Sequence, residues 1–361
     1  MSNSLSNRAA WRHALLTTPD LDKYISGVIL TEETFYQPLD TAHIHDSAST
    51  SSSNSGSDSG SSTSHSTGPR LVEALTSRGV AVGVKVDLGT APLNPNDPGS
   101  LFEIQTQGLE GLAQRCQQYA AGGATFTKWR AVLRIDEARG WPTAEAVGVN
   151  AQQLAQYAAV AQAAGLVPIV EPEVMVMEGA HGIEVSEAVS VRVLSAVVHA
   201  LLDHGVLLEG VVLKPAMVLP GSSSTSSTAG STSSSIIIAD EVAAATLRVL
   251  RRTVPPALPG IAFLSGGQGE MQAAQHLAAM NAACMAHEHA SDSIAAVVGS
   301  GCSCQPWVLT FSFGRALQAS ALQAWARNPT DVAAVQHAFS EVAAVAADAA
   351  NKASLATAAA A

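Results

Sequence analysis

The sequence predicts an α/β protein with the architecture of a (β/α)8 (TIM) barrel. Two observations lead to this fold class. Short apolar strands alternate with helical patterns along most of the 361 residues, which is typical of a parallel sheet with right-handed crossovers. Polar residues also collect where these strands end, and barrels of this class carry their active sites at the C-terminal ends of the strands.

Seven strands are predicted, each a short apolar run bounded by polar or turn residues. They lie at residues 26–30, 80–86, 126–135, 167–170, 211–213, 261–264 and 308–311. Helical patterns fall between most of them, at residues 109–121, 151–164, 185–202, 240–252, 271–283 and 315–326. A barrel of this class needs eight strands, so the prediction is one strand short.

The positions of the polar residues distinguish the barrel from a doubly wound sheet. A doubly wound sheet places its site in one crevice fed by few strands, whereas a barrel draws residues from many strand ends. Here the polar residues that we assign to the later part of a strand or just past its end are Lys85, Asp87, Lys128, Arg130, Glu171, Glu173, Lys214, Ser265, Ser312 and Arg315. Because nearly every predicted strand contributes, we favour the barrel.

We expect a single barrel domain over residues 1–342, interrupted by inserts at 41–66, 221–235 and 283–304. The first two inserts are rich in serine and contain too little apolar surface to offset the cost of ordering them, so we expect flexible loops. Residues 343–361 are rich in alanine, and we expect a flexible tail that continues a helix and then frays.

Composition excludes several classes of protein. A net charge of −11 argues against a nucleic-acid partner bound mainly through bulk charge. The sequence contains no long uncharged apolar stretch typical of a membrane span, and its first residues lack the apolar core of a secretory signal. Four cysteines are too few for disulfide bonds to stabilise a chain of this size, so we expect a reducing compartment.

The most informative single residue is Lys214, which lies in the apolar run Val-Val-Leu-Lys-Pro. Burial disfavours the charged form of an ammonium group and lowers its pKa. A neutral amine attacks carbonyl carbon, so a buried lysine is a candidate for forming a Schiff base. The alternative is a lysine at a strand end that extends its stem to reach water.

Seven blocks of sequence resemble class I fructose-bisphosphate aldolase, the Schiff-base type, in the form found in plants and algae. The resemblance runs from about residue 7 to about residue 352, apart from the serine-rich inserts. The blocks are SGVILTEETFYQ, GVKVDLG, GLEGLAQRCQQYAAGGATFTKWRAVLRI, VPIVEPE, EGVVLKPAM, GIAFLSGGQ and PWVLTFSFGRALQASALQAW.

The resemblance implies reversible cleavage of fructose 1,6-bisphosphate into dihydroxyacetone phosphate and glyceraldehyde 3-phosphate. Lys214 matches the imine-forming lysine, and the protonated imine is the electron sink, so no cofactor or metal is implied. Lys128 is a second cation that would lower the pKa of Lys214 by repulsion. Asp87 matches an acidic catalytic residue near Lys85, although a structural pairing with Lys85 is equally consistent with the sequence.

Two carboxylates flank Pro172, and their spacing of two places them on one side of a continuing strand. By resemblance, Glu171 is the proton shuttle and Glu173 is a supporting charge. Carboxyl groups are suited to the repeated proton transfers that forming and hydrolysing an imine require. The residues themselves leave open a structural alternative, in which the carboxylates form salt bridges to Lys128 and Arg130.

A bisphosphate substrate requires anion sites. Two segments that contain glycine are the candidate phosphate segments, namely Ser265–Gly267 and Gly314–Arg315. Glycine lets the backbone approach an oxyanion, a helix N-terminus presents free N–H groups, and arginine adds a forked donor. An isolated Ser-Gly-Gly is usually a turn, but the surrounding resemblance favours a phosphate cradle. The expected substrate-binding residues are Lys85, Arg130, Ser265, Gly266, Gly267, Ser312, Gly314 and Arg315.

The sequence departs from the family pattern at both ends. The family's first strand carries an Ala-Asp-Glu-Ser segment, whose aspartate handles the hydroxyl proton during cleavage. We find no such segment, and residues 7–12 resemble the helix that follows that strand. The family's C-terminal tyrosine is not matched, and Ala216 replaces a usual asparagine. We therefore expect a barrel with its first strand missing, truncated at both ends relative to the family.

These departures keep an alternative function open, a catalytically impaired aldolase-like protein that binds sugar phosphates or acts as a scaffold. Zinc binding by the third insert is a further possibility. Its spacing fits no zinc motif, although the side chains present are suitable ligands, namely Cys284, His287, His289, Cys302 and Cys304.

The expected partner is a phosphorylated sugar, with no nucleic acid and no membrane. Resemblance implies a homo-oligomer, as a tetramer. It also implies a location in the cytoplasm or the plastid stroma.

Overall fold

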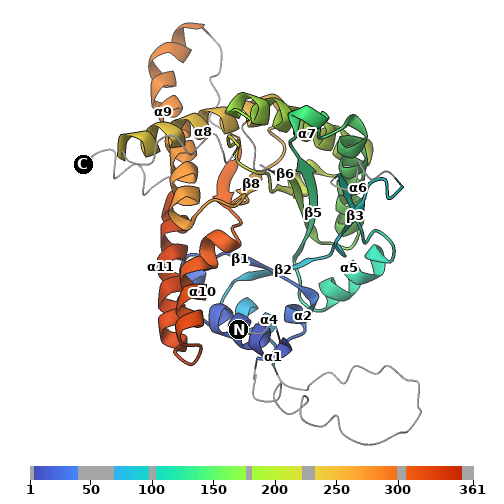
Figure 1. The fold of residues 1–361 in the computed structure, drawn as a ribbon, viewed down its shortest axis with the longest axis vertical. Coiled ribbons are helices and arrows are strands. Elements are labelled where there is room, and N and C mark those ends of the chain that lie inside the picture. Colours follow the sequence, from blue (N-terminus) through green and yellow to red (C-terminus); the bar gives the residue numbers. More distant parts are fainter. Residues whose placement is uncertain are drawn as a thin grey trace, which may run out of the picture.

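The structure is a computed structural model that describes residues 4–39, 69–96, 103–175, 181–221, 232–298 and 306–351. Seven parallel strands form its main sheet, in the order β1-β2-β5-β6-β7-β8-β9. The strands curl around a common centre and the helices lie outside them (Figure 1). The strands are β1 (Gly27–Leu30), β2 (Ala81–Lys85), β5 (Phe126–Arg134), β6 (Val167–Met175), β7 (Val212–Leu213), β8 (Gly260–Phe263) and β9 (Val308–Phe311).

These strands confirm the barrel-type fold and the seven predicted strand positions. Within the described ranges, β1 pairs only with β2 and β9 pairs only with β8, so the ring of strands is open between β1 and β9. A two-stranded antiparallel hairpin, β3 (Thr90–Pro92) and β4 (Ile104–Thr106), was not predicted.

Helices connect successive strands, as the alternating pattern predicts. The α-helices are α1 (Leu5–Leu16), α2 (Glu32–Phe35), α4 (Leu71–Thr76), α5 (Leu112–Ala121), α6 (Ala144–Ala163), α7 (Ile183–Asp203), α8 (Thr232–Thr253), α9 (Glu270–Val298), α10 (Arg315–Arg327) and α11 (Val332–Ala350). Short 3-10 turns cover Leu21–Lys23, Glu137–Arg139 and Leu208–Gly210. α7 is long and apolar enough to span a membrane by composition, but half of that stretch is buried and it packs between α6 and α8, as a core helix does.

Alternation along β5 separates a helix-facing side from an inner side. Successive side chains of a strand point to opposite faces, so Thr127 and Trp129 face one way while Lys128 and Arg130 face the other. Trp129 is fully buried and stacks on Tyr157 of α6, with ring centroids 5.5 Å apart. The Tyr157 hydroxyl also lies 3.0 Å from Thr127 Oγ1. The apolar outer face therefore forms the core with the helices, and the charged inner face is left for chemistry.

One glycine is required by close packing inside the ring. A Cβ added to Gly83 of β2 would lie 2.1 Å from the ring of Phe126 on β5. Real Cβ contacts are never that short, so only glycine lets the Phe126 ring lie across the neighbouring strand.

The helix layer joins the two edges that the strands leave apart. Trp11 of α1 contacts Trp325 of α10 edge to face, with ring centroids 5.6 Å apart. Gln336 of α11 donates its side-chain amide to the Ala14 carbonyl oxygen at 3.0 Å. We call these four residues the clasp, because they connect the first helix to the last two.

Helices extend into three segments that the sequence analysis sets apart from the barrel. α11 continues to Ala350 with Ala343, Ala346 and Ala349 buried, so the tail expected over residues 343–361 begins inside a packed helix. Successive alanines spaced by three fit closely against neighbouring helices, which explains this packing. The insert expected at 283–304 begins as a continuation of α9, and the one at 221–235 ends inside α8. The insert at 41–66 lies outside the described residues.

Candidate active site

The open side of the sheet borders a cavity of about 480 Å³. Its walls come from α1, from residues 24–31 with all of β1, and from residues 310–314 at the end of β9. Three lysines on successive parts of the sheet also line it, namely Lys85, Lys128 and Lys214. The cavity therefore joins the inner face of the strands to the gap between β1 and β9.

Lys214 belongs to a buried charged cluster in which Glu171 contacts two lysines. Its Nζ is 2.5 Å from Glu171 Oε1, and Lys128 Nζ is 2.8 Å from Glu171 Oε2. The first contact has hydrogen-bond geometry, while the second is an ion pair outside that geometry. The exposed fractions of Lys214, Lys128 and Glu171 are 7%, 7% and 4%, so neither ammonium group reaches freely into water.

Burial shifts the protonation equilibria of this cluster. Burial lowers the pKa of Lys214, and repulsion from Lys128 adds to the effect, against the opposing attraction of Glu171. Burial alone would raise the pKa of Glu171, but the nearby charges of Lys128 and Lys214 outweigh it, and its pKa is lowered. Glu171 is therefore a carboxylate that accepts a hydrogen bond from Lys214 and forms an ion pair with Lys128, and Lys214 is easier to deprotonate than a free lysine.

The parallel register explains why these residues meet. Lys128 of β5 is aligned with Ile169 of β6, two residues before Glu171, and Val170 is aligned with Leu213, the residue before Lys214. Side chains with the same parity share the inner face, so the three charged groups converge on one face from three adjacent strands.

A second ion pair lies beside the first, along the same two strands. Arg130 Nε is 2.5 Å from Glu173 Oε2, with Glu173 buried. The salt-bridge alternative for both carboxylates is thus observed. It coexists with convergence on Lys214 rather than replacing it.

Lys85 and Asp87 also form a pair. Lys85 Nζ is 2.6 Å from Asp87 Oδ1 and 3.0 Å from the Asp87 carbonyl oxygen. Asp87 is buried, whereas the Lys85 side chain is 36% exposed and lines the cavity. Asp87 therefore fixes the direction of the Lys85 side chain. This is the structural pairing that the sequence analysis gave as the alternative to a catalytic role for Asp87.

The two candidate phosphate segments leave neighbouring strands. Phe263 of β8 is aligned with Phe311 of β9, and the Ser312 amide donates to the Phe263 carbonyl oxygen at 2.8 Å. Ser312 and Gly314 line the cavity, and Arg315 is an exposed residue that begins α10. The turn after β8 is made of residues outside the described lining of the cavity, namely Ser265, Gly266 and Gly267.

Two polar residues beside that turn were missed by the sequence analysis. Gln268 and His276 are buried and hydrogen-bonded to each other, with 2.5 Å between His276 Nδ1 and Gln268 Oε1. The signal available was a histidine at an apolar position of a helix, and it indicates nothing specific by itself.

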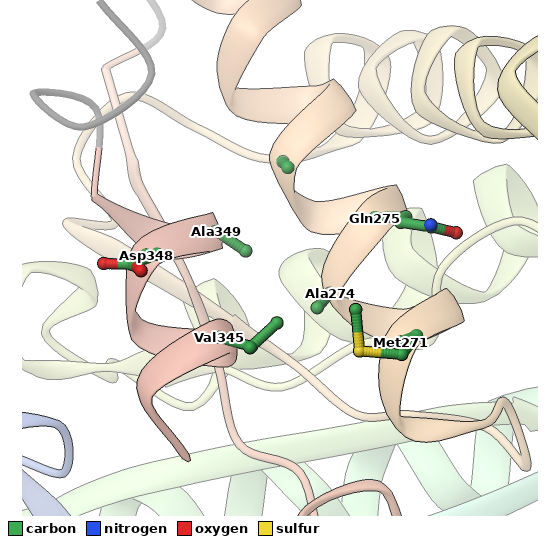
Figure 2. A pocket seen from close by; sticks show the side chains of 7 residues that line it. Met271, Ala274, Gln275, Val345, Asp348 and Ala349 are labelled. Atoms are coloured by element: carbon green, nitrogen blue, oxygen red, sulfur yellow. The ribbon is translucent and has the colours of Figure 1, made fainter. Parts of the chain in front are cut away.

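Other features of the described chain do not resemble a site for this chemistry. No group of three or more metal-ligating side chains occurs among the described residues, and the side chains of the possible zinc ligands from His287 onward lie outside them. A second cavity of about 360 Å³ lies between α9 and α11 and is lined mainly by apolar groups (Figure 2). Its lining residues are Met271, Ala274, Gln275, Ala278, Val345, Asp348 and Ala349.

Comparisons with known proteins show the family of this chain. A family model described as glycolytic, fructose-bisphosphate aldolase class-I, matches residues 1–48 and 61–360. The fructose-bisphosphate aldolase of Dictyostelium discoideum is 39% identical over 94% of this chain and 79% of its own length. The cytosolic fructose-bisphosphate aldolase 5 of Arabidopsis thaliana is 42% identical over 94% of this chain and 78% of its own length.

A solved structure shares the fold as well. Fructose-bisphosphate aldolase from Plasmodium falciparum, in a complex with TRAP and a small-molecule inhibitor, is 39% identical, with a TM-score of 0.77. The match covers 98% of this chain and 84% of that chain. Fold and relatives together define a carbon–carbon lyase built on a parallel barrel. The chain belongs to the class I fructose-bisphosphate aldolase family.

Proposed function

We propose that this chain cleaves fructose 1,6-bisphosphate reversibly into dihydroxyacetone phosphate and glyceraldehyde 3-phosphate through an imine on Lys214. The observation that supports this most strongly is the contact of 2.5 Å between Lys214 and Glu171 inside the sheet. A buried lysine with a lowered pKa supplies the neutral amine, and a carboxylate within hydrogen-bonding distance supplies a route for its protons.

The reaction follows from these groups. Lys214 Nζ adds to the substrate carbonyl carbon, and loss of water gives a protonated imine. The electrons of the breaking carbon–carbon bond then move into the imine, and the aldehyde product leaves. Protonation and hydrolysis release the ketone product and restore the amine. We assign the proton transfers to Glu171, and we assign Lys128 and Glu173 the role of setting the charge around it.

We place the substrate phosphates against cationic and backbone groups at the ends of the inner face. Lys85 and Ser312 line the cavity, which supports roles for both in binding substrate. Arg130 is held by Glu173 and therefore presents a fixed cation beside the cluster. We assign the remaining contacts to the backbone and side chains of Ser265, Gly266, Gly267, Gly314 and Arg315.

Borohydride trapping tests this function. Borohydride reduces an imine to a stable amine, so incubation with dihydroxyacetone phosphate should label Lys214, and mass spectrometry of the digested chain identifies the labelled residue. Coupled assay of fructose 1,6-bisphosphate cleavage should show turnover that is unaffected by a metal chelator. Absence of labelled Lys214 under saturating ligand would exclude the imine.

A second function, binding of sugar phosphates without turnover, is favoured by one observation. The described lining of the cavity contains three lysines and no carboxylate, whereas the family's first-strand aspartate handles the hydroxyl proton. This function predicts labelled Lys214 without cleavage of fructose 1,6-bisphosphate, so the two assays together separate the two functions.

We further propose a cytosolic location and a homotetramer. Relatives from Arabidopsis thaliana and Spinacia oleracea carry the names cytosolic and cytoplasmic isozyme, which supports the cytosol over the plastid stroma. Light scattering on the purified chain tests the tetramer, and fluorescence from a tagged full-length chain tests the location.

A further inference from the structure

Two buried polar side chains next to the Ser265–Gly267 turn have no part in the reaction described above. His276 on α9 is 2% exposed, and Gln268 between β8 and α9 is 8% exposed. They contact each other, with His276 Nδ1 2.5 Å from Gln268 Oε1. Burying such groups is costly unless they are paired, so the pair must contribute to the order of what it contacts.

The pair acts on the carbonyl oxygen of Ser265. The side-chain amide of Gln268 donates to this oxygen at 2.8 Å, and the backbone N–H of Gln268 donates to it at 3.0 Å. The backbone hydrogen bond closes a tight turn, and the side-chain hydrogen bond stabilises the same turn. Gln268 also points its side-chain nitrogen toward Met217 Sδ, 3.5 Å away.

The turn itself has little intrinsic preference for one shape. Gly266 and Gly267 have φ angles of +57° and +88°, in the region that favours glycine. Glycine gives up more conformational freedom on folding than any other residue, so such a turn is ordered only if its surroundings hold it. The two hydrogen bonds that the Ser265 carbonyl oxygen accepts from Gln268 hold the turn in its observed shape.

The direction of the hydrogen bonds is fixed by chemistry. An amide oxygen only accepts, so His276 Nδ1 must carry the proton that it shares with Gln268 Oε1. Burial lowers the pKa of His276 to about 4, so the ring is neutral at pH 7. A neutral donor at this position orients the Gln268 amide with its NH2 group toward Ser265 rather than away from it.

We propose that His276 is a positioning residue, which holds the Ser265–Gly267 turn through Gln268 in the shape that receives a phosphate of the sugar substrate. This inference rests on the proposed function, because it assigns the turn to phosphate. It adds a residue that touches neither the substrate nor the reacting atoms.

The test measures Lys214 labelling by borohydride as a function of dihydroxyacetone phosphate concentration in the full chain. Loss of one buried hydrogen bond in His276→Leu should raise the half-saturating concentration about tenfold, with the same plateau. Dihydroxyacetone, which lacks the phosphate, should saturate wild type and variant alike. His276→Asn, whose amide nitrogen replaces Nδ1 as donor, should return the half-saturating concentration to within about threefold of wild type.

Asn150→Leu is the matched control, because it also removes a buried polar side chain from a helix. Asn150 on α6 donates to the carbonyl oxygens of Ile104 and Ala146 and has no contact with the turn. Its melting temperature should fall, while its half-saturating concentration stays at the wild-type value. If His276→Leu fails to fold, Gln268→Glu keeps the side-chain shape and removes the donor to Ser265, with the same expected result.

Equal half-saturating concentrations for wild type and His276→Leu would overturn the positioning role, as would an equal shift with dihydroxyacetone. If the wild-type chain forms no label at all, the proposed imine chemistry fails instead. Calorimetric titration with inorganic phosphate then compares wild type with His276→Leu directly, and equal affinities would overturn the positioning role.

Discussion

The paired side of the sheet, around β5 and β6, differs from the open side, where β1 and β9 are the edge strands. On one side, β5 and β6 are aligned over their full lengths, from Phe126 opposite Val167 to Arg134 opposite Met175. The charged cluster of Glu171, Lys128 and Lys214 is buried there. On the other side, β1 and β9 have one described neighbour each, and a cavity lies between them.

This difference shows that the chemistry and the opening of the sheet are supplied by separate parts of the molecule. The two groups with lowered pKa values, Glu171 and Lys214, are placed by β6 and β7, which have neighbours on both sides. The open side supplies space for a ligand and access to Lys85. Variants that affect one side and not the other will establish how independent the two sides are.

The largest expected effect follows from removing the amine on the paired side. Lys214→Met should abolish borohydride labelling and lower turnover by about 10⁴-fold or more, as loss of a covalent nucleophile does. Lys23→Met is the matched control, because Lys23 is an exposed lysine in an ion pair with Asp20. Residual turnover in Lys214→Met close to wild type would contradict the imine mechanism.

The next effect is on stability. Glu171→Gln leaves two buried ammonium groups without their carboxylate, and breaking a buried ion pair in this way costs about 3–5 kcal/mol of unfolding free energy. Glu33→Gln, which removes an exposed partner of Arg8 and Arg12, should cost at most about 1 kcal/mol. Urea denaturation at pH 7 measures both, and similar values for the two variants would show that the cluster is not buried in solution.

The same cluster predicts a pH dependence. The pKa of Glu171 is lowered in the folded chain, so its contribution is complete above the unfolded pKa of about 4.3 and is lost as the pH falls through the lower folded value. Between these values the unfolded chain binds the proton and the folded chain does not. Unfolding free energy in wild type should therefore fall below about pH 5 more steeply than in Glu171→Gln.

A smaller effect is expected from packing inside the ring. Gly83→Ala places a methyl group against the Phe126 ring and should cost about 1–3 kcal/mol, measured by urea denaturation. Gly148→Ala is the control, because its added Cβ meets no atom within 4 Å and alanine favours the helix by about 1 kcal/mol. Equal stability of the two variants would mean that Phe126 does not lie across β2.

The smallest effect compares the two sides directly. Backbone amides of β1 and β9 have a strand neighbour on one side, so they should exchange with deuterium about tenfold faster than those of β5 and β6. Mass spectrometry of peptides from each strand measures this ratio. Slower exchange in β1 and β9 than in β5 would show that another segment covers these edges in solution.

Most of the fold could be predicted because strand and helix periods are local properties of the sequence. The seven strands follow from short apolar runs. Lys128, Glu171 and Lys214 meet because they share the inner face of adjacent strands, although Lys128 is the third residue of β5 and not at its end. The β3–β4 hairpin has three residues in each strand, too few for a periodic signal. The pairing of His276 with Gln268 depends on how α9 leaves the turn, which no local pattern encodes.

The clasp has a consequence for how this chain is made. The hydrogen bond from Gln336 to Ala14 joins positions 322 residues apart, and Trp11 meets Trp325 in the same region. Contacts this distant in sequence slow folding, because a long loop must close before they form. During synthesis, β5 and β6 emerge and pair while α11 is still untranslated. The strands that carry Lys128 and Glu171 are thus synthesised early, whereas the clasp forms only when the last two helices have been made.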